Sequence, residues 1–515
     1  MKIKQILAVC IFLAMVLSLS FGQKLDLSLP FTKEQMYKDF DEFVQIIKDI
    51  NIQGDVREVV TGYNPLTYIQ RERPKIENLN SYHEFIGFLE KCLSYTMCAH
   101  ASAAEKPIGI GLWNLDTSAI AVFASEWQEY EKQKAGGAQT IGRTFYYNGD
   151  YYIYGTQKMI KRYSEKNDTI VISDMRLISS NGQPMDTLFW KTLSSTYPIR
   201  LRWDYRKKKY YTGWLSIAPP QRILVEDFPT KKQYVLPLDS FNIEFSGISL
   251  PDSITRKITR EKSDNKTVKY YDSLGLLYIY MGAMIEDSVF IDSIKKVGKN
   301  KPIKKIIFDV RDNVGGSDYA WQYVLQAIIK DTLEEKIVVA MKNTEFAWKY
   351  IDVVKQEKKI QETRLPFLKN IDVVVLPSEI YKFPPDSNSL AFGGNIYILQ
   401  NEKVFSSGQA LVTYSKQIPQ LISVGVPTGH LAGRGYGKWI FQLKESKFTF
   451  YLDATIDVLG VKTADELFHD RPEIEIYPTL QEIIDMNNYG RFLNKRGDEF
   501  LFKHDYLFKK VLEMK

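Results

Sequence analysis

The chain has 515 residues, of which 44% are hydrophobic and 25% charged. This composition is ordinary for globular proteins and excludes a disordered or low-complexity chain. A formal net charge of +6 over this length makes no concentrated basic face, so we expect no nucleic-acid partner.

Residues 1–22 have the features of a secretory signal peptide. Lys2 and Lys4 precede an apolar run from position 6 to position 19, and the small residues Ser20 and Gly22 follow it. The run is shorter than the ~20 residues that span a bilayer, which argues against a membrane anchor. No later stretch is apolar enough to insert stably. We therefore expect an exported protein that is periplasmic, extracellular or surface-associated.

Residues 23–105 predict a small helical domain. Apolar side chains recur at helical spacing between positions 31 and 50, and Thr32 with Gln35 forms a capping box at the start of that helix. Ser81 and Glu84 repeat this pattern before a second apolar run. The second helix should lead into the segment that contains His100.

Two cysteines, Cys92 and Cys98, lie close to His100 in this stretch. An oxidising compartment would permit a disulfide between them, and two free buried thiols are equally compatible with the sequence. Because four ligands at zinc-binding spacing are missing, the sequence predicts no metal site.

Residues 106–235 change character and predict a β-rich domain. Aromatic and β-branched runs predominate there, and Asn148 with Gly149 between tyrosine-rich runs is a hairpin signal. From residue 236 to residue 515 the pattern alternates and favours a layered α/β core, with strands at 276–281, 306–310 and 395–399 and a helix near 319–329. Residues 355–388 are polar, contain proline and have no clear period, so we expect a surface insertion.

One candidate for chemistry is the segment 305–316 (KIIFDVRDNVGG), an apolar strand followed by a charged turn and two glycines. Glycines at this place let backbone N–H groups approach a ligand closely, as an oxyanion hole requires. An ordinary turn between a strand and a helix would look the same.

The second candidate is Ser406, which follows a strand at 394–399 and a loop at 400–405 and begins a helical run. A serine at this junction exposes its hydroxyl, and the free N–H groups of the helix can stabilise developing negative charge. Ser406 is thus a candidate nucleophile. The competing interpretation is an ordinary helix cap, since serine is common there.

Together the two segments resemble the signature pair of the tricorn-core and C-terminal-processing (tail-specific) serine peptidases, Asp-x-Arg-x-Asn-x-Gly-Gly and then a strand with Ser-x-x-Glu. Residues 421–429 (LISVGVPTG) resemble the segment after the nucleophile helix. Residues 466–476 resemble the closing motif, with Pro472, Glu473 and Ile474 inside it. Upstream, the segment ending at His100 resembles the region where these enzymes carry Asp-Gly-His-Thr. The resemblance covers almost the whole chain.

This resemblance implies that Ser406 is the nucleophile and that His100 is the general base, as in the tricorn-like branch. An imidazole suits this role because it titrates near neutral pH. The resemblance also implies an oxyanion hole from backbone N–H groups of Ser407, Gly315 and Gly316. No metal or organic cofactor is required.

The third catalytic member implied by the resemblance is Glu466, which would orient the imidazole; a solvated surface carboxylate is the alternative interpretation. The other branch of the family uses a lysine about 25 residues after the serine, where this chain has Leu431. Lys438 therefore remains a secondary candidate base. Among the histidines, His430 and His469 are further possible bases.

Several residues depart from the family pattern. Gln409 stands in the place of the usual glutamate, Ala99 and Ala101 flank His100, and Cys98 takes the place of the usual aspartate. A neutral Gln409 can form hydrogen bonds, but it cannot offset the charge of an imidazolium. These departures leave the position of the nucleophile unchanged.

The implied fold is α+β and multidomain. It has a helical N-terminal domain, a β-rich middle for which a PDZ-like fold is an option, and an α/β core like that of Clp protease and crotonase. The implied activity is hydrolysis of peptide bonds in secreted or periplasmic peptides or proteins. One alternative is a catalytically lapsed relative that binds peptides or an apolar ligand in the same cleft. Another is a surface protein that is structural or handles carbohydrate, suggested by the 32 tyrosines.

Overall fold

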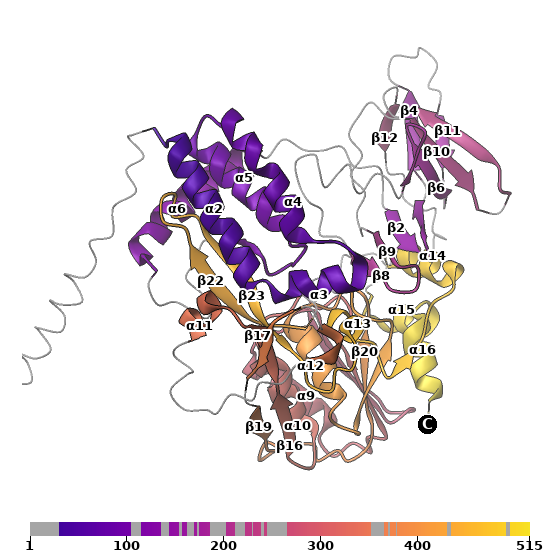
Figure 1. Cartoon of the computed structure of the whole chain (residues 1–515). Helices are drawn as coiled ribbons and strands as arrows, with labels where there is room; N and C mark the ends of the chain where they lie inside the picture. Colours follow the sequence, from indigo (N-terminus) through magenta and orange to yellow (C-terminus); the bar gives the residue numbers. More distant parts are fainter. Residues whose placement is uncertain are drawn as a thin grey trace, which may run out of the picture. The chain divides into compact units, whose positions relative to one another are not determined.

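The computed structural model describes residues 30–104, 115–134, 144–153, 157–161, 169–172, 175–185, 202–211, 222–228, 230–237, 241–244, 265–351, 365–368, 371–376, 378–429, 434–490 and 495–514. The predicted signal peptide and His430 lie outside these residues. The chain divides into two compact units. Figure 1 labels the helices and strands that make them up. The first unit comprises Met1–Gly136, Ala340–Pro377 and Gly435–Ile456, and the second comprises Gly137–Val339, Ser378–Arg434 and Asp457–Lys515.

This division differs from the predicted boundaries at residues 105 and 235. The β-rich middle and most of the C-terminal half share one unit, whereas two C-terminal stretches join the N-terminal helices. The reason is strand pairing over long sequence distances, which local patterns along the chain do not reveal. For example, β1 (Ser102–Ala103) pairs with β23 (Thr449–Asp457).

The first unit combines helices with a five-stranded sheet. The sheet has the order β1-β23-β17-β18, and β22 pairs with β23. Its remaining strands are β17 (Val339–Lys342), β18 (Val373–Val375) and β22 (Gly435–Gln442). The helices are α2 (Lys33–Ile50), α3 (Ile52–Thr61), α4 (Pro65–Glu72), α5 (Tyr82–Ser94), α6 (Thr117–Lys134) and α11 (Glu345–Ile351), with 3-10 helices at Arg73–Asn78 and Pro366–Leu368.

The predicted starts of α2 and α5 are confirmed. Thr32 and Gln35 form the complete capping box of α2, and the Ser81 side chain accepts a hydrogen bond from the Glu84 N–H at the start of α5. Aromatic side chains then join helices to strands within this unit: Phe43 on α2 lies 5.3 Å from Phe450 on β23, measured between ring centroids. The helical pattern of the sequence thus corresponds to a packed apolar face.

The second unit is organised around a six-stranded sheet. In spatial order its strands are β13 (Lys266–Tyr271), β14 (Leu276–Met281), β15 (Lys305–Asp309), β20 (Ile396–Gln400), β21 (Leu421–Gly425) and β24 (Ile474–Glu475). Strand β13 is antiparallel to β14, and the other neighbours are parallel. Strands β14, β15 and β20 agree with the three predicted strands to within one residue.

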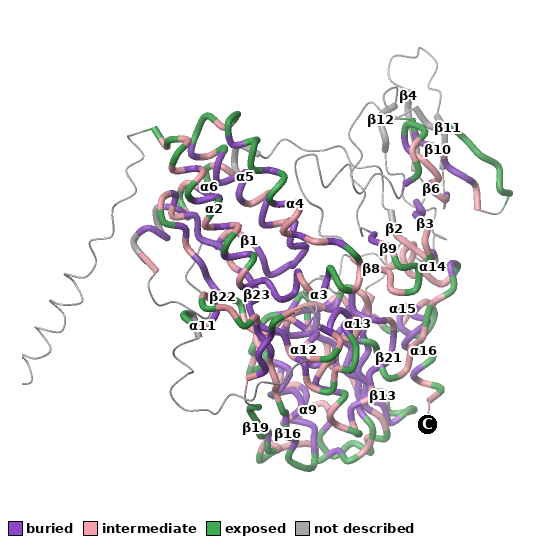
Figure 2. The backbone as a smooth tube through the Cα atoms, in the orientation of Figure 1, coloured by how far each residue is buried: buried purple, intermediate pink, exposed green. Residues whose placement is uncertain are grey.

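Helices cover both faces of this sheet. Leu277 and Ile279 pack in one core with α9 (Ser288–Gly298), α10 (Asp318–Ile328) and α12 (Ser407–Ser415). The alternate residues Leu276 and Tyr278 pack in another core with α15 (Asp498–Lys503) and α16 (Tyr506–Glu513). A strand points successive side chains to opposite faces, so a sheet buried on both sides reads as a continuous apolar run. In Figure 2, buried residues accordingly recur along α12 and β21.

The predicted β-rich middle is confirmed for much of its length. Asn148 and Gly149, both at positive φ, connect β2 (Thr144–Tyr147) to β3 (Asp150–Ile153) as predicted. The other strands of this region are β4 (Gln157–Lys161), β5 (Thr169–Ile172), β6 (Met175–Ser180), β7 (Gln183–Pro184), β8 (Arg202–Asp204), β9 (Lys209–Tyr211), β10 (Arg222–Asp227), β11 (Gln233–Pro237) and β12 (Phe241–Glu244). Its likeness to a PDZ domain, and that of the core to crotonase, stay predictions.

Two local predictions are wrong. The start of the supposed β-rich domain contains α6, whose sequence is rich in alanine, glutamate, glutamine and lysine, residues that favour helices. Within the supposed surface insertion, the three valines of β18 are buried in the first unit's sheet. That segment also holds the whole of β19 (Glu379–Phe383), which pairs with β16 (Leu333–Ile337) and is exposed except at Phe383.

The remaining helices of the second unit are short. They are α13 (Ala464–Phe468) and α14 (Leu480–Tyr489). Over the part of the chain that the structure describes, every helix is too short or too polar to cross a bilayer.

Candidate active site

Ser406 lies at the junction between the central sheet of the second unit and α12. Strand β20 ends at Gln400, and α12 begins at Ser407. Ser406 has a φ of 54° and a ψ of −124°, and its hydroxyl makes no capping bond to the described backbone of α12. An ordinary N-cap serine has extended dihedral angles and accepts a bond from the first turn. The helix-cap interpretation of Ser406 is therefore wrong.

The backbone at Ser406 is strained. A residue with a β-carbon at such a φ costs about 1–3 kcal/mol, and such strain persists where the surrounding structure holds it in place. In hydrolases of another fold, a strained turn between a strand and a helix exposes the nucleophilic serine. The strain is thus a physical argument for function that the sequence pattern could not supply.

The glycine turn of the first motif packs directly against Ser406. A β-carbon added at Gly315 would lie 2.5 Å from the Ser406 Cβ and 3.1 Å from its Oγ. One at Gly408, in the first turn of α12, would lie 2.8 Å from Oδ1 of Asn313. The Phe405 N–H also donates to the Asn313 carbonyl, at 3.0 Å. The two predicted motifs therefore meet, and glycine is required where they touch.

The amides of this turn have different partners. The Gly315 N–H donates to Oδ1 of Asn313 at 2.8 Å, while the Asn313 side-chain amide donates to the Met281 carbonyl at 2.7 Å. Among the described residues, no group accepts a hydrogen bond from the backbone N–H of Gly316 or from that of Ser407. The predicted oxyanion hole is corrected accordingly: the amide of Gly315 holds the turn in shape, and the amides of Gly316 and Ser407 remain as candidate donors.

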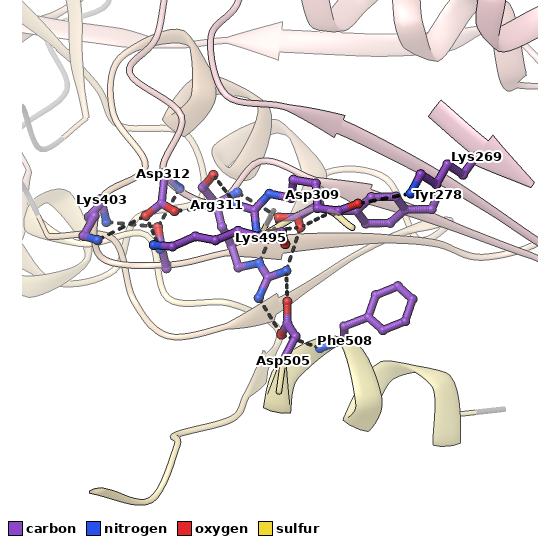
Figure 3. A network of polar contacts seen from close by, with 11 residues as sticks. Lys269, Tyr278, Asp309, Arg311, Asp312, Lys403, Lys495, Asp505 and Phe508 are labelled. Atoms are coloured by element: carbon purple, nitrogen blue, oxygen red, sulfur yellow. Dashed lines mark hydrogen bonds and ion pairs between the residues drawn. The ribbon is translucent and has the colours of Figure 1, made fainter. Parts of the chain in front are cut away.

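The charged residues of the first motif form a buried ion-pair network (Figure 3). Arg311 donates to both carboxylate oxygens of Asp505, at 2.8 and 2.6 Å, and also to Asp309 at 2.9 and 2.6 Å. Asp309 accepts in addition from the Tyr278 hydroxyl at 2.8 Å. Because Asp505 caps α16 through the Phe508 N–H, the network ties the end of β15 to the C-terminal helix. It positions the glycine turn.

His100 lies in the first unit, where its ring nitrogen Nδ1 is 2.7 Å from Oδ2 of Asp453. Both side chains are buried. A carboxylate at Nδ1 fixes the ring orientation and the tautomer, with the proton on Nδ1 and Nε2 left to accept one. The pair has the geometry of a general base with its orienting acid.

Strand pairing explains how the pair forms. His100 immediately precedes β1, whose residues Ser102 and Ala103 pair with Tyr451 and Phe450 of β23. Asp453 lies on the same strand β23, 353 residues from His100 in the sequence. The available sequence signal was a carboxylate between the apolar residues Leu452 and Ala454 of this strand, because such a group is rarely buried without a partner.

The two cysteines near His100 are both free and buried, so the second of the two sequence interpretations is confirmed. The Cys98 thiol donates to Oδ2 of Asp453 at 3.5 Å. Burial, and then the charge of Asp453, raises the pKa of the Cys98 thiol well above its usual range. Cys98 is thus a protonated neighbour of the pair.

Glu466, the predicted orienting acid, belongs to the second unit and makes local contacts. Its carboxylate accepts from the Lys462 N–H at 2.8 Å, and its own N–H donates to the Thr463 hydroxyl that caps α13. Glu466 lines a pocket of about 340 Å³ together with Lys416, Arg434 and other residues of that unit. The acid that contacts the His100 ring is Asp453, which the sequence analysis did not identify.

Gln409 is explained by its buried partner. Its side-chain amide donates to Oδ2 of Asp470 at 2.8 Å, and Thr413, Lys416 and Arg434 also bond this carboxylate. Burial alone would raise the pKa of Asp470, but the charges of Lys416 and Arg434 hold it below its usual range. A glutamate at position 409 would place a second negative charge against Asp470. The neutral Gln409 therefore departs from the family pattern in a way that suits its buried partner Asp470.

The other candidate bases have different surroundings. Lys438 is exposed on β22 of the first unit, with its ammonium 5.7 Å from the centre of the Tyr451 ring. His469 is buried, its Nδ1 lies 3.3 Å from the Thr428 carbonyl, and burial lowers its pKa.

Comparison with known families gives one match, which falls on the segment that carries both motifs. Residues 275–457 match the model of peptidase family S41. No curated protein matches the chain. The family match supports a serine-type peptidase, a class of hydrolase.

Solved structures give further likeness at low sequence identity. The crystal structure of mature CPAF is 13% identical, with 93% of this chain and 98% of that chain covered and a TM-score of 0.50. The photosystem II D1 C-terminal processing protease is 11% identical, with 91% and 99% covered and a TM-score of 0.38. The tricorn protease is 13% identical, with 89% and 37% covered and a TM-score of 0.24. The likeness to mature CPAF supports a multidomain fold of mixed helix and sheet.

Proposed function

We propose that this chain hydrolyses peptide bonds in exported peptides or proteins through an acyl-enzyme on Ser406, with His100 as the base. The observation that carries the proposal is the strained Ser406 between β20 and α12, with Gly315 packed against it. The Asp453 to His100 pair supports a histidine base, as in the tricorn-like branch. The predicted signal peptide supports an exported setting.

The proposed reaction has two halves. The Ser406 oxygen attacks the peptide carbonyl carbon while its proton passes to Nε2 of His100, and the peptide N–H groups of Gly316 and Ser407 stabilise the oxyanion. The same proton then goes to the leaving amine. Water attacks the acyl-enzyme by the reverse route and releases the acid product. Asp453 keeps the ring in the required tautomer and stabilises its cation.

A fluorophosphonate probe tests this proposal, because it phosphonylates only a serine that is activated as a nucleophile. We expect Ser406→Ala to abolish labelling and to lower peptide hydrolysis by about 10⁴-fold or more, with the circular dichroism spectrum unchanged. The matched control is Ser415→Ala, which removes the hydroxyl at the other end of α12. Retained hydrolysis in Ser406→Ala would refute the nucleophile.

The same labelling experiment distinguishes an active peptidase from a catalytically lapsed relative. A catalytically lapsed relative would leave wild-type Ser406 unlabelled and would still bind peptides. His100→Ala should lose labelling together with turnover, since the probe also needs the base. Labelling that survives in His100→Ala would assign the base to another residue.

A further inference from the structure

Three buried side chains of the first unit form a cluster around one carboxylate. Cys98, His100 and Asp453 each offer one ligand atom, and these atoms all lie within 4.8 Å of one another. The His100 Nδ1 is 2.7 Å and the Cys98 sulfur 3.5 Å from Oδ2 of Asp453. The sequence showed only two of these residues together, and β23 brings the third.

The two oxygens of the Asp453 carboxylate differ in the hydrogen bonds that they accept. Its Oδ2 accepts from Cys98, from His100 and from the Gln53 amide at 3.0 Å. Its Oδ1 is buried and has no hydrogen-bond partner within the described residues, although only 1% of the side chain is exposed. A buried carboxylate oxygen without a donor is costly, and a cation held by the same carboxylate would reduce that cost by offsetting its charge.

The surrounding chain leaves space for this group. Gly435 lies opposite Ile456 at the start of β22. A β-carbon at Gly435 would collide with the Asp453 carboxylate and the Gln53 amide. Glycine at this position therefore keeps room for the cluster between α3, β1 and the two strands of the hairpin.

We propose that Cys98, His100 and Asp453 bind a thiophilic divalent cation of the Zn²⁺ class, which holds His100 in an inactive form. Bonds of about 2.0–2.3 Å in a tetrahedral site put neighbouring ligand atoms about 3.2–3.8 Å apart. The 3.5 Å between the Cys98 sulfur and Oδ2 of Asp453 already fits this range. The 2.7 Å between Nδ1 of His100 and the same oxygen would have to lengthen by about half an ångström. A thiolate with an imidazole selects Zn²⁺ over Mg²⁺ or Ca²⁺, which prefer oxygen ligands.

Inhibition of peptide hydrolysis follows from a change in the tautomer of the His100 ring, and this step rests on the proposed function. A cation on Nδ1 displaces the proton of that nitrogen, so the neutral ring carries its proton on Nε2. That nitrogen then cannot accept the proton of Ser406. The cation also takes the place of the thiol proton, which passes to solvent. Removing the cation restores the hydrogen bond to Asp453 and with it the base.

Cobalt(II) is the probe, since it occupies zinc sites and a sulfur ligand gives it a near-ultraviolet charge-transfer band. We expect the full chain to show this band at one equivalent of Co²⁺ and to lose it on addition of excess Zn²⁺. Cys98→Ala should lack the band, whereas Cys92→Ala, which removes the other buried thiol of this region, should keep it. Asp453→Asn should weaken Co²⁺ binding by about 10-fold or more.

A second measurement links the site to turnover. Each variant is assayed with chelator and with Zn²⁺, and its inhibition is expressed relative to its own rate in chelator. We expect Zn²⁺ to inhibit the wild type and Cys92→Ala by at least about 10-fold, and Cys98→Ala by less than about 2-fold. Cys98→Ser provides a second variant if Cys98→Ala does not fold, as judged by circular dichroism.

The outcomes are distinguishable. A missing cobalt band in the wild type, or a band that persists in Cys98→Ala, overturns the site whether or not the chain is a peptidase. A band that depends on Cys98 in a chain without hydrolytic activity keeps the site and refutes the proposed function. Zn²⁺ inhibition that is independent of Cys98 would place the inhibitory ion elsewhere and overturn the proposal.

Discussion

The two candidate halves of the catalytic apparatus are built by different means. In the second unit, the Ser406 junction is shaped by backbone: a positive φ at Ser406 and glycines at 315 and 316. In the first unit, the base is made by side chains, because His100 depends on a carboxylate 353 residues away. Backbone shape leaves a local sequence motif, whereas a side-chain pair across strands leaves none. This difference explains which half was visible in the sequence.

The largest effect should come from breaking the side-chain pair. Asp453→Asn places an amide against Nδ1 of His100 and favours the wrong tautomer, so we expect kcat to fall by about 10³- to 10⁴-fold. Glu466→Gln is the matched comparison, since it neutralises the acid that the resemblance implied. Steady-state kinetics with a peptide substrate decides between them. A larger loss in Glu466→Gln than in Asp453→Asn would restore Glu466 as the orienting acid.

The backbone geometry of the Ser406 junction is tested by adding one methyl group to the glycine turn. Gly315→Ala puts a β-carbon 2.5 Å from that of Ser406, so either the serine or the turn must shift. We expect a loss of at least about 10²-fold in kcat/KM, because misplacement of a reacting atom by about 1 Å has this cost. Gly393→Ala is the control, since its nearest neighbour lies 3.7 Å away. Full activity in Gly315→Ala would show that the turn does not shape the site.

The buried ion pairs beneath the glycine turn should affect stability. Arg311→Met removes the guanidinium that pairs with the buried carboxylates of Asp309 and Asp505, and Asp309 keeps only the Tyr278 hydroxyl and the more distant Arg496. We therefore expect the free energy of unfolding to fall by about 3–5 kcal/mol. Arg73→Met is the matched control, because Arg73 makes the same two-bond contact with Asp41 in an exposed position. That variant should lose at most about 1 kcal/mol. Urea denaturation measures both, and equal losses would contradict a special role for burial.

The smallest effect concerns how α2 holds the turn between β22 and β23. Asp39 accepts from the N–H groups of Glu445 and Ser446, and burial raises its pKa to about 6. The folded chain then binds the proton more tightly than the unfolded chain, so this group's contribution to stability falls as the pH rises from about 4 to about 6. The loss should reach about 2–3 kcal/mol.

Asp39→Asn should remove this pH dependence, and denaturant midpoints between pH 4 and pH 7 would show it. Asp41→Asn is the control on the same helix, because Asp41 is exposed. An unchanged slope in Asp39→Asn would mean that the hydrogen bonds from the turn offset the cost of burial.

Sequence reasoning was reliable for local features. The capping box at Thr32, the N-cap at Ser81, the hairpin at Asn148 and the strands around β14 and β15 are where they were predicted, although Glu84 does not complete a capping box with Ser81. It failed where pairing is distant: β18 was taken for a surface insertion, and the domain boundaries overlooked the stretches that join the first unit. Sequence reasoning also missed α6, whose composition favours a helix.

The sequence by itself offered Ser406 and the glycines of the turn as candidates, because these depend on neighbouring residues, and the approximate class of enzyme came from the resemblance of the two motifs to a known family. Only the tertiary structure decided that Asp453 orients His100, that Gly315 donates its amide to Asn313, and that Gln409 faces Asp470. The physical reason is that hydrogen bonds between buried side chains depend on distance in space, and strand pairing sets that distance without leaving a local pattern.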